Sequence, residues 1–568
     1  MYVHKVFSIV RVFRASLPIF FIVTFFLWNS TQPRATQEAD LIRYDRVSER
    51  IIEIKNAMLD VETSVGTTSP VPVERGRWTE EEIGSEAQWQ QMLQFILSRK
   101  ATISKQSDYL TIERSNRLMG VLRTPSYMVF IDINDRSMVK AMNTKTGSID
   151  YSSTDAKTVI QSAINALPRD GGQIFAKAGT YFISSSIQVN RSNVWIAGEG
   201  RGHTVLQAAD AALLSTNLID FLPSRLSNIR IENLTVDGNK AHNADLRDDD
   251  EQCLIASIER DLTDIYLINV EVRNSPRHGI RLVGGTAGGT KGVHCINVLA
   301  HDNGEEGIEY DFRIDDSDII NSKAYKNTIG MGIYGSHNFS LIGGEAYDNG
   351  GANVQIAYSG SQNAFRNRVT GVNIHHSSVG IDIWGDVDMS TFEFNAIYNH
   401  DSNNGFGIFI SGKGPSRRCE DNVVARNVID SVLNKGITFD RYADRNFVVE
   451  NMVMNSRWVG IDIANSTVND TLVVDNLLDK NETPLRDNGT HTQFSRNASL
   501  VARSGTAATT NTAISSTPTR YITNSSTSKL TSTTRPVTFL STSYCMTIRT
   551  QISRASATEI TTHNTFIE

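Results

Sequence analysis

The feature that most constrains this chain is a short repeat in its centre. Strands that begin with glycine, or with a residue in its place, recur every 21 to 29 residues, with a mean spacing of about 26. Their first residues are Gly279, Gly307, Gly332, Asn353, Gly380, Gly407, Gly436, Gly460 and Pro484. A second short strand precedes each one, and no helical pattern lies between them. This period, with short alternating strands, predicts a β-solenoid rather than a helical repeat or a propeller.

A solenoid of this kind needs a cap, because its open end is an unpaired sheet edge. The stretch SSTDAKTVIQSAINAL predicts a capping helix begun by Ser153 or Thr154. Its apolar face consists of Val159, Ile160, Ala163, Ile164 and Leu167. Asparagine also recurs after the second strand of the units, which indicates either turn formers or a coil-to-coil hydrogen-bond ladder. The asparagines concerned are Asn274, Asn303, Asn327, Asn349 and Asn399.

These motifs together resemble a known superfamily. The capping helix, the segments GGQIFAKAGTYFI, VWIAGEGRGHTVLQ and IENLTVDGN, and the HGI coils are similar to proteins of the pectate lyase superfamily. The resemblance covers roughly residues 151–498 and is of the exported archaeal and bacterial surface type. It implies an all-β, right-handed parallel β-helix of about 10–13 coils. It does not fix a function, because that superfamily includes lyases, hydrolases, uronate epimerases, adhesins and tailspikes.

The family's own catalytic motifs are missing from this sequence. The N-T-D and G-H-G motifs of polygalacturonase-type hydrolases are absent, and so is the D-P-H motif of alginate epimerases. Asp315-Asp316 is an acidic pair, but it falls in an expected turn. Nor is there a nucleophile elbow, a phosphate-binding loop or an HExxH zinc motif. No named activity can therefore be carried over residue by residue.

Candidate chemistry is expected on the outward side of the glycine-led strands. Alternation points Ile308, Tyr310 and Phe312 inward and Glu309, Asp311 and Arg313 outward. One outward row then reads Arg281, Glu309, Tyr334, Gln355, Asp382, Phe409, Thr438 and Asp462. The next row reads Val283, Asp311, Ser336, Ala357, Trp384, Ser411, Asp440 and Ala464. Acids, arginine and aromatics mixed in this way are typical of a sugar-binding face.

The densest group on this face is the candidate catalytic site. It contains Arg281, Glu309, Asp311, Arg313 and Tyr334. Two carboxylates at this spacing suit glycoside hydrolysis. Lysis or epimerisation of a uronate would instead need a base, here Arg or Tyr, and a neutraliser, here Arg or Ca²⁺ held by the acids. The alternative is a surface ion-pair patch joining Arg281 to Glu309 and Asp311 to Arg313.

A second group is a candidate substrate-binding site further along the chain. Its members are Asp382, Trp384, Lys413, Asp440 and Asp462. An exposed Trp384 would offer a platform on which sugar rings stack. Scattered surface residues are the alternative. The acidic run at 248–251 and the pair His375-His376 are weaker candidates for cation binding, and no resident metal is predicted.

The first 30 residues predict export. Lys5, Arg11 and Arg14 precede the apolar run of residues 17–28, which is typical of a signal peptide or a membrane anchor with a cytoplasmic N-terminus. Residues 31–107 predict a helical stalk or spacer, and 108–150 a small β region with a turn at 134–136. The alternative for this part of the chain is a small packed subdomain. Ten N-x-S/T acceptors fit an exported glycoprotein: Asn29, Asn190, Asn233, Asn338, Asn465, Asn469, Asn481, Asn488, Asn497 and Asn524.

The rest of the sequence mainly excludes other classes of protein. Residues 499–568 are rich in serine and threonine and predict a disordered tail. Four widely separated cysteines rule out a disulfide framework and predict small core residues. A net charge of −7 and a pI of about 6.0 argue against nucleic-acid binding. A trimerising stalk, and hence a homo-oligomer, stays open.

The sequence thus predicts an exported, cell-surface or membrane-anchored β-helix protein whose partner is a polysaccharide. The first hypothesis is an enzyme acting on an acidic polysaccharide as a lyase, hydrolase or epimerase. The second is a non-catalytic carbohydrate-binding or adhesin-like protein. The mixed acidic and aromatic face favours the first, and the missing motifs favour the second.

Overall fold

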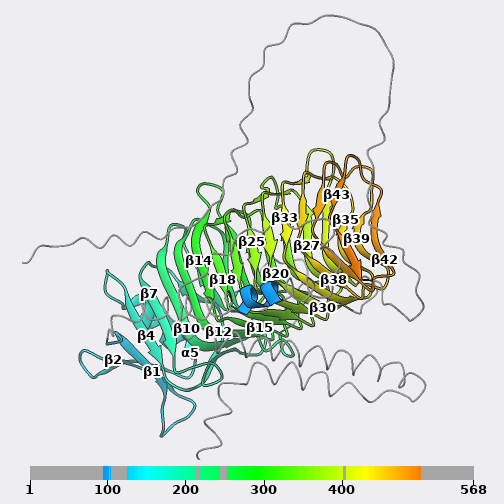
Figure 1. Cartoon of the computed structure of the whole chain (residues 1–568). Helices are drawn as coiled ribbons and strands as arrows, with labels where there is room; N and C mark the ends of the chain where they lie inside the picture. Colours follow the sequence, from blue (N-terminus) through cyan, green and yellow to red (C-terminus); the bar gives the residue numbers. More distant parts are fainter. Residues whose placement is uncertain are drawn as a thin grey trace, which may run out of the picture. The chain divides into compact units, whose positions relative to one another are not determined.

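The predicted fold class is confirmed by the computed structural model, which describes residues 94–101, 103, 124–212, 217–243, 252–400 and 405–500. Short strands wind into a right-handed parallel β-solenoid, and the colours of Figure 1 follow one another coil by coil. Each coil contributes strands to two long parallel sheets, and later coils add a short third one. Apolar side chains from all three sheets form one continuous core. This is the stacked arrangement that units too small to fold alone require.

The 12-stranded sheet contains the glycine-led strands, one from each coil. Its strands are β6 (Ile187–Val189), β9 (Ile219–Phe221), β11 (Ile255–Arg260), β13 (Ile280–Gly284), β16 (Glu306–Asp311), β20 (Ile329–Tyr334), β23 (Ala352–Ala357), β27 (Val379–Gly385), β31 (Phe406–Gly412), β35 (Lys435–Phe439), β39 (Val459–Ile463) and β42 (Thr483–Asp487). All neighbouring pairs run parallel, so residues at equal positions in successive coils form rows along the solenoid.

The 28-stranded sheet receives two strands from most coils. Its first row is formed by β4 (Gly172–Ala176), β7 (Val194–Gly198), β10 (Ser227–Asp237), β12 (Thr263–Arg273), β14 (Thr290–Ile296), β18 (Asp318–Ile320), β21 (Ser340–Ile342), β25 (Arg368–Thr370), β29 (Thr391–Glu393), β33 (Val423–Ala425), β37 (Phe447–Val449), β40 (Leu472–Val474) and β43 (Gln493–Ser495). The long strands β10 and β12 also reach into the second row. That row adds β5 (Gly179–Ile183), β8 (Thr204–Ala208), β15 (Leu299–His301), β19 (Lys323–Tyr325), β22 (Glu345–Tyr347), β26 (Asn373–His375), β30 (Ala396–His400), β34 (Val428–Val432), β38 (Met452–Met454), β41 (Leu477–Asp479) and β44 (Ala498–Leu500).

Two-residue strands line the turn that follows the 12-stranded sheet. Four of them form the 4-stranded sheet: β24 (Ala364–Phe365), β28 (Val387–Asp388), β32 (Cys419–Glu420) and β36 (Ala443–Asp444). A fifth, β17 (Ile314–Asp315), pairs with the start of β14. Asp315 is therefore the last residue of a two-residue strand, and the expected turn includes Asp316, which has a left-handed φ of 51°.

The predicted capping helix is confirmed as α5 (Ala156–Asn165). Its predicted apolar face is buried, including Val159 and Ile164 at 0% exposure. The predicted N-cap is wrong by one or two residues, because the side chain of Asp155 accepts the backbone N–H groups of Lys157 and Thr158. A carboxylate at this position also suits the positive end of the helix dipole.

A small antiparallel element precedes the helix. β1 (Tyr127–Ile131) and β2 (Val139–Asn143) flank the predicted turn, and β3 (Ile149–Ser153) pairs with β2. β1 also pairs in parallel with β4, so this element continues the 28-stranded sheet. Strands β1 to β3 therefore form the first edge of the solenoid, and the part of the expected β region before residue 124 lies outside the described residues.

The glycine alignment was wrong at one coil. Gly330, not Gly332, stacks between Gly307 and Asn353: a Cβ on Gly307 would lie 2.8 Å from the Gly330 carbonyl oxygen, and a Cβ on Gly330 would lie 2.5 Å from that of Asn353. The same close approach to the next coil requires glycine at 279, 380, 407, 436 and 460. A two-residue error preserves the inward and outward faces but moves every side chain of that strand into the neighbouring row.

Asparagine ladders join the coils. Asn303 donates to the side-chain oxygen of Asn327 at 3.0 Å, and Asn327 donates to that of Asn349 at 3.1 Å. A second ladder runs through Asn395, Asn427, Asn451, Asn476 and Asn497. Asn274 and Asn399 instead take left-handed backbone conformations, with φ of 56° and 54°. Three of the five predicted asparagines thus form a ladder, and two are turn formers.

Several predicted segments lie outside the described residues. They are the apolar leader, most of the stalk, the acidic run 248–251 and the tail from 501 onward. Residues 94–101 are helical, within the span where a helix was expected. Among the residues the structure covers, no helix is both long and apolar enough to span a membrane. Cys253, Cys295 and Cys419 are buried, at 0% exposure each, which confirms them as core residues.

Candidate functional site

The outer face of the 12-stranded sheet carries most of the candidate site residues. Strand pairing aligns Arg281 with Glu309, Gln355 with Asp382, and Thr438 with Asp462. The adjacent row aligns Asp311 with Tyr334, and Ala357 with Trp384. Ile308 and Tyr310 are fully buried in the core, as alternation predicted. The two predicted outward rows are therefore present, with the exception of one coil.

At that coil Tyr334 was placed in the wrong row. Gly332 stands between Glu309 and Gln355, and Tyr334 lies beside Asp311, where Ser336 was expected. The phenol nevertheless bends back over Gly332, where a Cβ would lie 2.5 Å from the hydroxyl oxygen. Tyr334 therefore fills the gap that the glycine leaves, and its hydroxyl reaches the row in which the sequence placed it.

A third row faces the same side and was not foreseen. In each strand of the 12-stranded sheet, this row consists of the residue just before the leading glycine, or before the residue that takes its place. Strict alternation predicts that a side chain at this position points inward. Glu306 contacts His278 and Tyr334, and Lys435 pairs with Asp462. Val379 and Phe406 line a hollow with Asp382. The sequence signal was available, because His278 and Glu306 stand immediately before Gly279 and Gly307.

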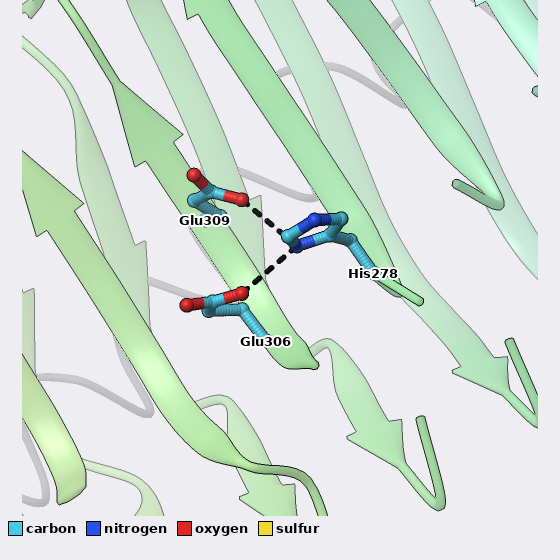
Figure 2. A group of neighbouring side chains, drawn as sticks. All are labelled: His278, Glu306 and Glu309. Carbon is cyan, nitrogen blue, oxygen red and sulfur yellow. Dashed lines mark ion pairs between the residues drawn. The ribbon is translucent and has the colours of Figure 1, made fainter. Parts of the chain in front are cut away.

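The centre of the candidate site is a buried histidine surrounded by acids (Figure 2). His278 is 4% exposed, and its Nδ1 lies 2.9 Å from Oε2 of Glu306 and 2.9 Å from Oε2 of Glu309. Its Nε2 lies 2.8 Å from Oε2 of Glu305. Arg281 flanks this group, with Nε 3.2 Å from Oε2 of Glu309 and Nη2 3.8 Å from Oδ2 of Asp311. Two positive side chains and four carboxylates thus share one crowded corner.

Burial and these contacts move the pKa values of the cluster. Burial lowers the pKa of His278, but the three glutamates raise it more, so it lies well above 6.5. Burial raises the pKa of Glu309 and of Asp311, although His278 and Arg281 oppose the shift. Contact with His278 lowers the pKa of Glu305 to about 2. Loss of hydration on burial is therefore the main reason why the carboxylates of Glu309 and Asp311 hold protons more tightly than in water.

One predicted member, Arg313, does not join the cluster. Arg313 adopts a left-handed φ of 62°, and its Nη1 donates to the carbonyl oxygen of Thr286 at 2.7 Å instead of pairing with Asp311. Phe312, expected in the core, also has a left-handed φ of 48° and is partly exposed. Alternation ends at Asp311 because β16 ends there and the chain turns.

A hydrogen-bond chain extends from this cluster to the second candidate group. The Tyr334 hydroxyl lies 3.3 Å from Oε1 of Glu306 and donates to Oε1 of Gln355 at 2.8 Å. The Gln355 amide donates to Oδ2 of Asp382 at 2.6 Å. Burial raises the pKa of Asp382 to about 6 and holds that of Tyr334 well above 10. The phenol is therefore neutral, and a proton donor, across the ordinary pH range.

Beyond Asp382 the face becomes aromatic and cationic. A hollow of about 350 Å³ is lined by Gln355, Val379, Asp382, Trp384, Phe406 and Phe409. Trp384 is 38% exposed and packs against Tyr358, with ring centroids 5.2 Å apart. Lys413 lies over both rings, and Arg417 over Tyr358 at 4.4 Å from its centroid. The structure thus brings Asp382, Trp384 and Lys413 together, as the second group predicted.

The two remaining members of that group lie further along. Asp462 is completely buried, with its carboxylate 2.7 Å from Nζ of Lys435 and 2.6 Å from Nε of Arg486. Both cations also cover Trp458, which is 44% exposed. Asp440 pairs with Arg441 at 3.1 Å. Direct contact between Asp462 and a ligand would require these cations to move, whereas Trp458 is already accessible.

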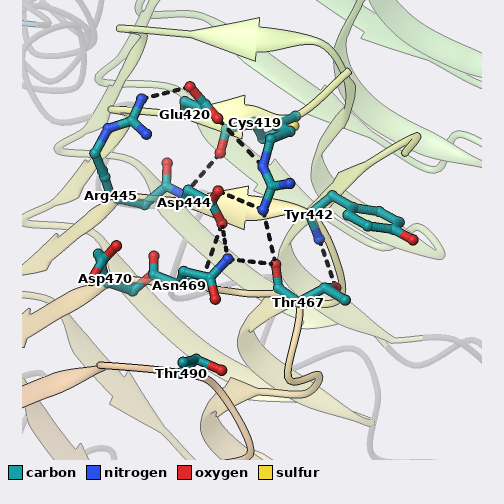
Figure 3. A network of polar contacts seen from close by, with 12 residues as sticks. Cys419, Glu420, Tyr442, Asp444, Arg445, Thr467, Asn469, Asp470 and Thr490 are labelled. Carbon is teal, nitrogen blue, oxygen red and sulfur yellow. Dashed lines mark hydrogen bonds and ion pairs between the residues drawn. The ribbon is translucent and has the colours of Figure 1, made fainter. Parts of the chain in front are cut away.

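Another charged cluster lies near the 4-stranded sheet and differs from the His278 cluster because its charges are paired between neighbouring turns (Figure 3). Arg418 pairs with Asp444 at 2.5 Å, and Arg445 pairs with Glu420 at 2.5 Å. Asn469 adds two hydrogen bonds to Asp444, through its backbone N–H at 3.1 Å and its amide at 2.9 Å. Each acid faces a cation or amide of a neighbouring segment, so this network joins the turns of successive coils.

His375, which the sequence offered as a weaker candidate for cation binding, lies on the 28-stranded sheet and stacks between Tyr347 and Tyr398.

The cluster at His278 is also where the described residues could hold a cation. His278, Glu306 and Glu309 each offer one ligand atom, and these atoms lie within 4.8 Å of one another. Ca²⁺ was a possible cofactor on the sequence, but it takes oxygen ligands almost exclusively. A donor set with an imidazole fits Ca²⁺ poorly and fits metals of intermediate hardness better.

Comparison with known proteins points to enzymes that act on alginate. No protein-family model matches the chain. The mannuronan C5-epimerase AlgE5 of Azotobacter vinelandii is 30% identical over 221 residues, which are 37% of this chain and 22% of that protein. Alginate lyase 7 of the same organism is 26% identical over 198 residues, or 33% of this chain and 22% of that protein. The chain thus spans about a fifth of the length of the curated relatives it matches.

One solved structure supports the architecture. The N-terminal fragment of bacteriophage phi29 gene product 12 has a TM-score of 0.50 at 13% identity, covering 61% of this chain and 64% of that one. The A-module of the A. vinelandii mannuronan C5-epimerase AlgE4 has a TM-score of 0.45 at 18% identity, covering 60% and 95%. At such identities structural likeness speaks for the fold alone. The chain is a right-handed parallel β-helix protein.

Proposed function

We propose that this protein binds an acidic polysaccharide along the outer face of the 12-stranded sheet and exchanges or removes the C5 proton of a uronate at the His278 cluster. The observation that carries the proposal is the placement of both groups on one continuous face. Proton-transferring residues lie at Arg281–Tyr334, and the exposed Trp384 with its cations lies a few coils away. A chain bound along this face would contact both.

The chemistry of the second group matches an acidic sugar chain. Trp384 and Trp458 offer accessible ring surfaces, and each lies beside a lysine and an arginine or a second aromatic ring. Aromatic faces stack on the apolar faces of sugar rings, while the cations attract carboxylates. A neutral polysaccharide would use the rings but not the positive charges of Lys413 and Arg417 beside Trp384 and Tyr358.

The first group offers the parts of a C5 proton transfer. Arg281 can neutralise the uronate carboxylate, which makes the neighbouring C–H more acidic. Asp311 and Tyr334 retain some exposure and can remove and return the proton, with Glu309 beneath them. Epimerisation returns the proton to the opposite side of the ring, whereas lysis expels the neighbouring sugar. The similarity to C5-epimerases and to an alginate lyase supports this reaction class over hydrolysis.

Isotope exchange distinguishes these reactions. The purified chain is incubated in D₂O with polymannuronate, polyguluronate or polygalacturonate, and the products are followed by NMR and ultraviolet absorbance. Deuterium at C5 with inverted configuration identifies an epimerase, and absorbance from a new double bond a lyase. New reducing ends without a double bond would overturn the proposal in favour of hydrolysis. Tyr334→Phe is expected to lower turnover by about 100-fold, and Tyr398→Phe, on the other sheet, serves as the matched control.

A non-catalytic function is the second candidate, favoured by one specific observation. The carboxylates of the first cluster are largely buried and paired internally, whereas Trp384 and Trp458 are exposed. Binding of polyuronates on a glycan array, without turnover in D₂O, would support this carbohydrate-binding or adhesin-like function.

The proposed substrate implies that the protein acts outside the cytoplasm. The basic and apolar leader at residues 5–28 supports export, followed either by cleavage or by retention as an anchor. Fractionation of cells with an antibody to the solenoid would decide between the two. Protein in the medium would favour cleavage, and protein in the membrane fraction would favour an anchor.

A further inference from the structure

The acids around His278 are arranged differently from those of an ordinary ion-pair cluster. Nδ1 of His278 faces two carboxylate oxygens, one from Glu306 and one from Glu309, each 2.9 Å away. An imidazole N–H lies in the ring plane and can point at one acceptor only. Neither ring nitrogen of His278 nor Oε2 of Glu309 has a partner that meets hydrogen-bond geometry, although all three atoms are buried. Three potential ligand atoms thus converge without satisfying one another.

The spacing suits a small divalent cation. Two ligand atoms 2.9 Å apart, each about 2.1 Å from a common ion, subtend an angle of about 90° at that ion. Right angles are those between adjacent ligands of an octahedral site. The two carboxylate oxygens lie within 4.8 Å of one another, and bringing them to about 3 Å apart would complete one face of such a site.

The other ring nitrogen lies beside a carboxylate, which is the kind of neighbour that metal-binding histidines have. Nε2 of His278 lies 2.8 Å from Glu305, and Arg277 holds Glu305 in turn, with Nη2 3.0 Å from Oε1. When a cation displaces the proton of Nδ1, a carboxylate at Nε2 favours the tautomer that keeps its proton there, and the lone pair of Nδ1 is then directed between Glu306 and Glu309. This arrangement of carboxylate, histidine and ligand position is the common support of a protein-bound metal.

We propose that His278, Glu306 and Glu309 bind one divalent cation of intermediate hardness, such as Mn²⁺ or Zn²⁺, in preference to Ca²⁺. The donor set combines one imidazole with two carboxylates, which suits these metals and not an ion that prefers oxygen alone. Arg281 and Tyr334 border the site on the outer face of the sheet. If the proposed function holds, this cation faces the carboxylate of the bound uronate.

Metal binding is tested without any polysaccharide, so its outcome is independent of the proposed reaction. The purified, metal-free chain is titrated with Mn²⁺, and the free ion is measured by electron paramagnetic resonance. Metal content after dialysis against Zn²⁺ gives the stoichiometry. One site per chain is expected, with at least tenfold weaker binding of Ca²⁺ in competition. No stoichiometric uptake of either metal, or a preference for Ca²⁺, would overturn the proposal.

Variants locate the site. His278→Gln and Glu309→Gln should abolish uptake, and Glu306→Gln, at the most exposed ligand, should weaken it at least tenfold while leaving the circular dichroism spectrum unchanged. Glu305→Gln is expected to weaken binding 10- to 100-fold, because it supports the ligand without touching the ion. Glu345→Gln is the matched control, since Glu345 contacts His375 at 3.3 Å on the other sheet. Uptake that survives both Glu306→Gln and His278→Gln would refute the assignment.

Discussion

The hydroxyl of Tyr334 occupies the space above Gly332, two residues earlier on the same strand. A Cβ on Gly332 would lie 2.5 Å from that oxygen and 2.7 Å from Cζ of the ring. The absence of a side chain at 332 therefore lets the phenol bend back toward Glu306 and Gln355. One glycine thus determines where a candidate proton donor lies.

Gly332→Ala should displace the Tyr334 ring and break its hydrogen bond to Gln355. Polyuronate turnover is expected to fall at least tenfold, and the free energy of unfolding by only about 1–2 kcal/mol, because the ring can swing toward solvent. Activity assays and urea denaturation measure the two effects. The double variant Gly332→Ala/Tyr334→Phe should be no less active than Tyr334→Phe alone. A further loss of turnover in the double variant would show that Gly332 affects activity by something other than the position of Tyr334.

Trp384→Ala should weaken binding of polyuronates about 5- to 30-fold, because it removes an exposed ring of the proposed binding face. Isothermal titration calorimetry at low and high salt measures the effect. Phe447 is similarly exposed, at 40%, but lies on the 28-stranded sheet, so Phe447→Ala is the matched control. Equal losses in both variants would contradict a specific face.

Asp382→Asn tests the raised pKa of about 6 at Asp382. Because this pKa lies above the unfolded value, the folded state holds the proton more tightly, and the free energy of unfolding falls as pH rises from about 4 to 6. The variant should match the parent near pH 4 and exceed its stability above pH 6, by at most about 3 kcal/mol. Urea denaturation at pH 4, 5, 6 and 7 follows the divergence. Parallel stability curves over this range would exclude the shift.

The fold could be predicted from the sequence because one physical constraint repeats in every coil. Glycine is needed where the next coil's carbonyl approaches, as at Gly307 and Gly407, and inward positions such as Ile308 and Ile408 must be apolar. Those two requirements recur at nearly constant spacing. The error at Gly332 arose because two glycines stand two residues apart, and alternation alone cannot choose between them.

The site was only partly predictable, for a local reason. Glu309, Asp311 and Arg281 follow from alternation and lie together. His278 and Glu306 precede the strand glycines, where the chain enters the strand and alternation does not apply. Arg313 was misplaced at the other end, where the backbone turns into a left-handed conformation. The sequence therefore indicates side-chain direction within a strand but not at its first or last residue.

Asn427→Ala should destabilise the solenoid through its ladder. Asn427 is fully buried, accepts from the backbone and side chain of Asn395, and donates to Asn451 and to the carbonyl of Phe392. Its removal leaves several buried groups unpaired, so the free energy of unfolding should fall by about 2–4 kcal/mol. Urea denaturation measures this. Asn488→Ala, at an exposed position, should change stability by less than about 0.5 kcal/mol.

Asp462 supports the face from beneath, because its buried carboxylate holds Lys435 and Arg486 against Trp458. Asp462→Ala leaves both cations without their buried partner and should lower the free energy of unfolding by about 3–5 kcal/mol. If the variant folds, its affinity for polyuronates should also fall, since the freed cations no longer stay beside the ring. Restoring a carboxylate on a longer side chain, with Asp462→Glu, should recover part of both losses. Calorimetry measures the affinity and urea denaturation measures the stability of the same samples. Normal affinity for polyuronates in a destabilised Asp462→Ala chain would show that Trp458 binds them without its neighbouring cations.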